Sequence, residues 1–85
     1  MLGQIDKIGT SLFSDNSSDL APGESKTLDL TAPTDGRPFF WGFEIPDKKK
    51  VFFIGMDVAG TATLKLRFYN SEPMDKVTVK VFIRQ

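Results

Sequence analysis

The sequence predicts an all-β fold, a small antiparallel β-sandwich or barrel with an N-terminal arm or short helical turn. Apolar and polar residues alternate along several segments, which recur about every ten residues and are separated by Gly, Pro, Asn and Asp. At 85 residues the chain has room for one small domain. We expect residues 1–19 to form an N-terminal arm and polar linker, and residues 20–85 to form the β-sandwich.

Five segments carry the alternation, and each has one apolar face that we expect to point inward. The predicted inward residues are Leu28 and Leu30 in 25–31; Phe39, Trp41, Phe43 and Ile45 in 38–45; Phe52, Ile54, Met56 and Val58 in 51–58; Ala62, Leu64, Leu66 and Phe68 in 61–69; and Val77, Val79, Val81 and Ile83 in 76–84. A three-residue loop over 59–61 would join the third and fourth segments and place Met56 opposite Leu64.

The first nineteen residues show no such alternation. Ile5, Ile8 and Leu12 recur at spacings of three and four, which favours a short helical turn. Glycine costs a helix interior about 1 kcal/mol relative to alanine, so Gly3 and Gly9 leave an extended arm as the alternative. The polar run SDNSSD over 14–19 is typical of a loop or linker.

The composition argues against catalysis. The chain has no cysteine and no histidine, so disulfides, thiolate metal sites, a cysteine nucleophile and the usual general base are all excluded. Asp15, Asn16 and Asp19 do not have the spacing of a calcium-binding EF-hand loop, and no spacing pairs two carboxylates for acid–base work. We therefore expect a protein that is not an enzyme and that uses no cofactor or metal.

The charge balance bears on partners. The formal net charge is +0, which gives no global field for nucleic acid or an anionic membrane.

No apolar run approaches the roughly 20 residues that a membrane-spanning helix needs. The first residues lack a cationic segment followed by an apolar one, so the sequence predicts no secretion signal.

Charge is nevertheless divided along the chain. Residues 1–47 carry eight acidic and three basic side chains, and residues 48–85 carry eight basic and three acidic ones. One interpretation is electrostatic complementarity between copies or with an acidic partner. The other is that the two halves fold onto each other and neutralise internally.

Four basic residues form a candidate electrostatic docking set. Lys65, Arg67, Lys80 and Arg84 would share one face if the last two strands were neighbours. With Phe53 and Phe82 as stacking groups they would suit single-stranded nucleic acid, which the zero net charge does not favour. The alternative is a solvated outer face whose lysines protect strand edges.

Aromatic residues are abundant, with eight Phe, one Trp and one Tyr. Some fall opposite the predicted apolar faces, so either a two-sheet core buries both faces or an apolar patch serves assembly. Trp41 with nearby Phe would alternatively suit a carbohydrate- or cell-surface-binding module. The candidate assembly interface is Leu2, Ile5, Ile8, Leu12, Phe13, Phe40, Phe53 and Phe82.

The stretch 51–85 carries further patterns: Ala59-Gly60, a Thr-rich strand from Thr61, an Asn70 that closes this strand, and a Val-alternating strand over 77–83. In these it resembles the C-terminal half of small β-sandwich modules in tailed-phage virions, and LAPGESKTLDL over 20–30 resembles their opening strand. The resemblance implies a capsid, decoration, connector or tail component without enzymatic activity. It implies no catalytic or binding residue.

We therefore expect a non-enzymatic structural protein of a virus particle that acts through subunit packing. Its partners would be copies of itself and a coat or tail protein lattice, with no membrane involved. It would be located in the virion and assembled in the host cytoplasm. The alternative functions are a soluble ligand-binding module and, less favoured, a single-stranded nucleic-acid binder.

Overall fold

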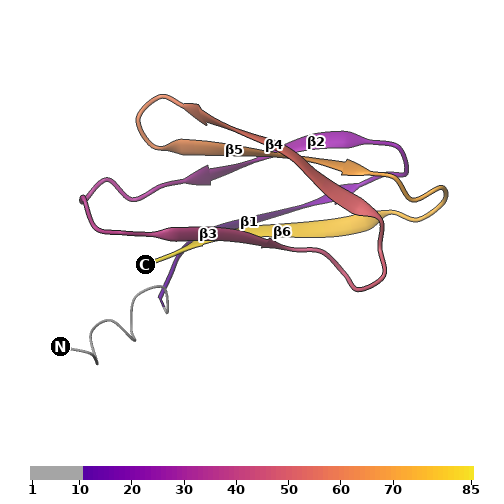
Figure 1. Cartoon of the computed structure of the whole chain (residues 1–85), viewed down its shortest axis with the longest axis horizontal. Helices are drawn as coiled ribbons and strands as arrows, with labels where there is room; N and C mark the ends of the chain where they lie inside the picture. Colours follow the sequence, from indigo (N-terminus) through magenta and orange to yellow (C-terminus); the bar gives the residue numbers. More distant parts are fainter. Residues whose placement is uncertain (1–10) are drawn as a thin grey trace.

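The computed structural model describes residues 11–85, which form six antiparallel strands (Figure 1). The strands are β1 (Leu12–Leu20), β2 (Ser25–Thr31), β3 (Phe40–Glu44), β4 (Val51–Ala59), β5 (Thr63–Asn70) and β6 (Val77–Arg84). They pair in two three-stranded sheets, in the orders β1-β6-β3 and β2-β5-β4. This confirms the predicted all-β sandwich. The predicted arm or helical turn, with Leu2, Ile5 and Ile8, lies outside the described residues.

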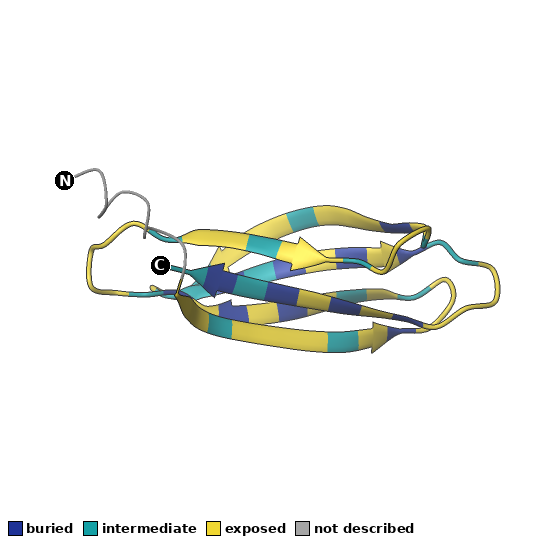
Figure 2. Cartoon of the chain, turned by 90° about the horizontal axis from the view of Figure 1, so that it is seen from below, coloured by how far each residue is buried: buried dark blue, intermediate teal, exposed yellow. Residues whose placement is uncertain are grey.

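The core lies between the two sheets and is built mainly from the central strands β5 and β6. Buried and exposed residues alternate along these strands, as the banding in Figure 2 shows. The inward residues predicted for β2 and β6, and those from Leu64 onward in β5, are confirmed. The fully or almost fully buried apolar residues include Leu20, Leu28, Leu30, Leu66, Phe68, Val77, Val79, Val81 and Ile83. No helix capable of spanning a membrane is found in the part of the chain that the structure describes.

The loop predicted over 14–19 is wrong, because these residues belong to β1 and pair with β6. Ser14, Asn16 and Ser18 lie opposite Ile83, Val81 and Val79, so they occupy inward positions. An inward row of small polar residues carries no hydrophobic alternation, which is why the sequence pattern did not indicate a strand. Residues from Leu12 onward are therefore part of the sandwich.

Strand β4 contains a β-bulge at Ile54, which changes the face of the residues on either side. Beyond the bulge Phe53 lies opposite the buried Phe68, and Phe52 lies opposite the outward-facing Tyr69. The prediction that Phe52 points inward, and that Phe53 belongs to the outer aromatics, is therefore wrong.

The loop between β4 and β5 has three residues, as predicted, but it spans 60–62 instead of 59–61. Met56 consequently lies opposite Leu66 and not opposite Leu64. Gly60 opens the loop with a left-handed φ of 59°, a conformation that favours glycine. A shift of two residues keeps every side chain on its face, so the hydrophobic pattern alone could not distinguish the two registers.

Asn70 joins one end of the sandwich and is the only polar residue classed as buried within 11–85. Its Nδ2 donates to the carbonyl oxygens of Leu20 and Asp75, each at 2.9 Å, and its Oδ1 accepts from the Glu72 amide. The end of β1, the end of β5 and the β5–β6 loop thus meet at one side chain.

Candidate functional site

One side of the sandwich, where β1 lies beside β2, is closed by hydrogen bonds. Asn16 Nδ2 donates to the carbonyl of Asp29 at 3.0 Å, and Ser14 Oγ donates to that of Thr31 at 2.9 Å. Lys26 Nζ donates to Ser18 Oγ and to the Asp19 carbonyl. Side chains from β1 therefore satisfy backbone carbonyls on the β2 edge, which would otherwise be open to another strand.

The opposite side, where β3 lies beside β4, is joined by contacts between aromatic rings. Among residues 11–85 no hydrogen bond or ion pair links these two strands. The Phe53 ring centroid lies 5.6 Å from that of Trp41 and 5.5 Å from that of Phe43. Phe53 and Phe43 in turn contact the buried ring of Phe68.

These inward-facing residues of β3 and β4 remain strongly exposed. Trp41 and Phe53 are each 36% exposed, and Val58 is 64% exposed. The sequence placed all of them except Phe53 on inward faces, but within residues 11–85 no further layer covers the side where they emerge. We call this surface the open side; its residues are Trp41, Phe43, Phe53, Met56 and Val58.

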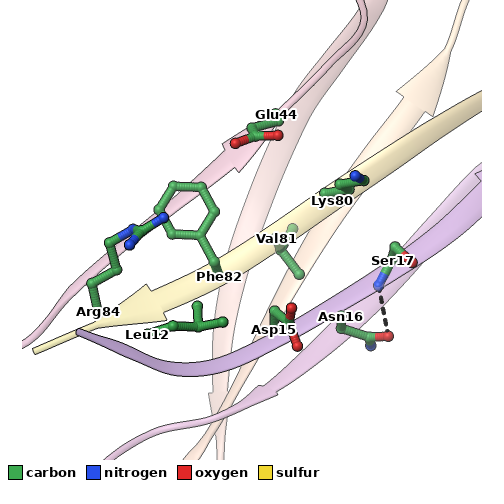
Figure 3. A pocket seen from close by; sticks show the side chains of 9 residues that line it. All are labelled: Leu12, Asp15, Asn16, Ser17, Glu44, Lys80, Val81, Phe82 and Arg84. Carbon is green, nitrogen blue, oxygen red and sulfur yellow. Dashed lines mark hydrogen bonds between the residues drawn. The ribbon is translucent and has the colours of Figure 1, made fainter. Parts of the chain in front are cut away.

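The outer surface of the β1-β6-β3 sheet has a mixed character (Figure 3). A hollow of about 550 Å³ on this surface is lined by charged and apolar side chains. The Phe82 ring stands in it, with the Arg84 guanidinium carbon 5.2 Å from the ring centroid. We call this surface the charged face; its defining residues are Leu12, Asp15, Phe40, Glu44, Lys80, Phe82 and Arg84.

The outer surface of the other sheet carries paired charges. Lys65 Nζ lies 3.1 Å from an Asp29 oxygen, and an Arg67 Nη2 lies 3.8 Å from an Asp57 oxygen. Lys65 and Arg67 are on β5, whereas Lys80 and Arg84 are on β6 in the other sheet. The four basic residues of the predicted docking set are therefore split between opposite outer surfaces.

This split also separates the predicted nucleic-acid site. Phe53 lies between the sheets, Phe82 lies on the charged face, and Lys65 and Arg67 lie on the far surface. These groups do not form one continuous groove for a strand. Trp41, the candidate sugar platform, has part of its surface covered by Phe53.

Ion pairs connect the acidic and basic halves of the chain at two places within 11–85, Asp29 with Lys65 and Asp19 with Lys76. The Thr78 hydroxyl donates to Asp19 and, together with the nearby Lys76 ammonium, lowers the pKa of that carboxyl below its ordinary value of 3.8. The Arg37 amide and guanidinium lower the pKa of Asp35 in the same way. These ion pairs between the two halves of the chain thus neutralise part of their opposite charges.

The predicted assembly residues fall into separate places. Leu12, Phe40 and Phe82 lie together on the charged face, because Leu12 and Phe40 flank Arg84 on opposite sides. Phe53 belongs to the open side, and Phe13 lies at a bulge near the start of β1. Hydrophobic alternation alone did not reveal the exposure of Met56 and Val58, because it cannot show which strands are edges.

The acidic residues do not gather. Glu44 is on the charged face, whereas Asp57 is on the outer surface of the other sheet. Over residues 11–85 no group of three or more acidic, His or Cys side chains is placed to hold a metal ion. Comparison of the chain with protein families, with curated proteins and with solved structures finds no match.

Proposed function

We propose that this chain is a non-enzymatic structural subunit that packs against other copies of itself through the open side. The observation that carries the proposal is the contrast between the two sides of the sandwich. Polar side chains close the β1–β2 side, whereas the β3–β4 side exposes apolar residues that already face inward. An inward-facing apolar residue that stays exposed is the kind of surface that a neighbouring subunit covers.

The free energy gained by burying apolar side chains supports this contact. Full burial of a Val, Met or Phe side chain stabilises by about 1.5–3 kcal/mol. A domain of this size buries only roughly 60–65% of its unfolded surface, so its stability is small. Association that buries the open side adds to that stability.

We further propose that this subunit belongs to a virus particle. The strand pattern of 51–85 is similar to that of β-sandwich modules in tailed-phage virions. A decoration, connector or tail component would bind copies of itself and a coat or tail protein lattice, and it would be located in the virion. This setting rests on the resemblance alone, whereas the self-packing rests on the open side.

Analytical ultracentrifugation of the Val58→Glu variant tests the self-packing. The measurement is made in 0.5 M NaCl, because a Debye length of about 4–5 Å screens charged contacts but leaves apolar ones. We expect the wild-type protein to form species heavier than the 9.5 kDa chain as its concentration rises. We expect Val58→Glu to remain monomeric, because it places a charge on the open side.

Met74→Glu is the matched control. Met74 is 86% exposed in the β5–β6 loop, away from the open side, and the substitution makes the same change of apolar to acidic. This variant should associate like the wild type. A wild-type protein that stays at the monomer mass, or equal loss of association in both variants, would contradict the proposal.

A further inference from the structure

The charged face carries four ionised side chains that form no ion pair with any other residue of 11–85: Asp15, Glu44, Lys80 and Arg84. The central strand of the other sheet behaves differently, since both Lys65 and Arg67 reach an acidic residue on a neighbouring strand. Lys80 has Glu44 directly opposite in the register but does not pair with it. Within residues 11–85 no ion pair neutralises these four charges, so they suit pairing with charges on another molecule.

The same face offers apolar contact area and two recesses. Leu12 and Phe40 are both 54% exposed, on either side of the β6 end that carries Arg84. Besides the hollow around Phe82 (Figure 3), a second one of about 250 Å³ lies at the other end of β3, between Pro46 and Thr78. Apolar residues and both signs of charge on one surface make it complementary to itself.

We propose that a second copy of this chain binds through the charged face, so that the β1-β6-β3 sheets of the two copies face each other. The two-fold axis lies between these two facing sheets and runs perpendicular to their strands. The inference rests on the proposed function, because it supplies the second contact of a self-assembling subunit. A two-fold contact uses the same surface on both copies. A subunit with two contact surfaces, the open side and the charged face, joins more than one other copy.

The register distinguishes two axes centred on β6. With an axis parallel to the strands and directly over β6, Lys80 would face Lys80 of the second copy, and Arg84 would face Arg84. With the axis perpendicular to the strands, midway between Lys80 and Phe82, each strand lies over the same strand of the second copy and is antiparallel to it. Of these two arrangements centred on β6, the second avoids facing like charges.

In this arrangement Lys80 lies over the level of Phe82 in the second copy. Asp15 is the β1 neighbour of Phe82 at that level, so Lys80 of each copy is one strand from Asp15 of the other. Sheets pack about 10 Å apart and strands about 4.8 Å apart, a span that lysine and aspartate bridge together. Phe40 of each copy comes to lie over the hollow beside Pro46 and Thr78 of the other.

Reciprocal charge reversal tests this contact in the Val58→Glu background, which removes the open-side contact. In about 25 mM salt, where exposed charges are weakly screened, we expect the Val58→Glu protein to form a dimer. Adding Lys80→Glu, or adding Asp15→Lys, should weaken that dimer about tenfold or more, because each places two like-charged pairs across the interface. Mixing the two variants in equal amounts should restore a heterodimer, which also shows that both are folded.

Two controls reverse the same charges elsewhere. Lys50→Glu lies beside β4 and Asp57→Lys lies on the outer surface of the other sheet, both away from the charged face, so they should leave the dimer unchanged. A Val58→Glu protein that is monomeric in low salt would overturn the charged-face contact. So would a mixture that fails to associate. Neither result affects the high-salt test of the open side, so the two proposals fail separately.

Discussion

The Phe82 ring of β6 covers Gly42 of β3, its cross-strand partner. A β-carbon placed on Gly42 would stand 2.7 Å from the ring Cζ, closer than side chains approach each other. Glycine weakens a strand, and an aromatic ring from the neighbouring strand compensates by covering the exposed backbone. The other sheet repeats the relationship, since Arg67 of β5 lies over Gly55 of β4.

A double-mutant cycle on Gly42 and Phe82 should therefore show coupling. Gly42→Ala alone should destabilise, because the new methyl group displaces the ring. In a Phe82→Ala background the same change should stabilise by about 0.5–1 kcal/mol, the usual gain of alanine over glycine in a strand. Urea unfolding measures both. Gly55→Ala should cost less than Gly42→Ala, because the long Arg67 side chain moves away; additive effects at Gly42 and Phe82 would contradict the contact.

Asn16→Ala should destabilise the fold by about 1 kcal/mol, because it removes the hydrogen bond that caps the Asp29 carbonyl on the β2 edge. Ser17→Ala is the matched control, since Ser17 is on the outward face of β1 and its hydroxyl forms no hydrogen bond within 11–85. Equal free energies of unfolding for the two variants would show that the closed side does not depend on this contact.

Asn70→Ala should reduce the free energy of unfolding by about 2–4 kcal/mol, because it leaves the carbonyl of the buried Leu20, and that of Asp75, without this donor. Asn70→Asp keeps the shape of the side chain but replaces the donating amide with an acceptor that faces the Leu20 and Asp75 carbonyls. At neutral pH it should be at least as destabilising as Asn70→Ala. Denaturant unfolding checks this, and near-wild-type stability of Asn70→Asp would contradict the role given to the amide.

Stability should fall in acid through Asp19 and Asp35. The folded-state pKa of each carboxyl lies below the ordinary value of 3.8, so folding favours the charged form. The resulting stabilisation is complete above pH 3.8 and is lost as the pH falls through the lowered folded-state pKa. Thermal unfolding as a function of pH should show this loss.

A Thr78→Val variant isolates one cause of the shift at Asp19. Without the hydroxyl donor, the pKa of Asp19 should rise toward its ordinary value, while that of Asp35 stays unchanged. Carboxyl NMR titration measures both groups. A wild-type Asp19 that titrates at its ordinary pKa would rule out the hydrogen bond as a source of stability.

Periodicity predicted five of the six strands, because each of the five carries alternating apolar residues, whether or not these are buried. It failed at β1, where Ser14, Asn16 and Ser18 face inward and bond to an edge instead of filling a core. These hydrogen bonds require β2 to lie beside β1, and a local sequence pattern does not show which strands are neighbours in the fold. The bulge at Ile54 is similar: one extra residue reverses the faces of Phe52 and Phe53, and nothing in their apolar character marks the position.

The candidate surfaces were only partly predictable. Leu12, Phe40 and Phe82 were expected at an interface, and the structure brings them onto one surface. The four basic residues were grouped on the assumption that β5 and β6 are neighbours, whereas each is the centre of a different sheet. The open side could not be predicted, because its residues look like core until the strand order shows that β3 and β4 are edges.

Trp41 fluorescence tests the central claim most directly. It is the only tryptophan in the chain, and it lies on the open side at 36% exposure. If copies pack through this side, acrylamide quenching of Trp41 in 0.5 M NaCl should decrease as protein concentration rises, and it should stay constant in Val58→Glu. Quenching that remains unchanged while the wild-type protein gains mass would show that association uses another surface.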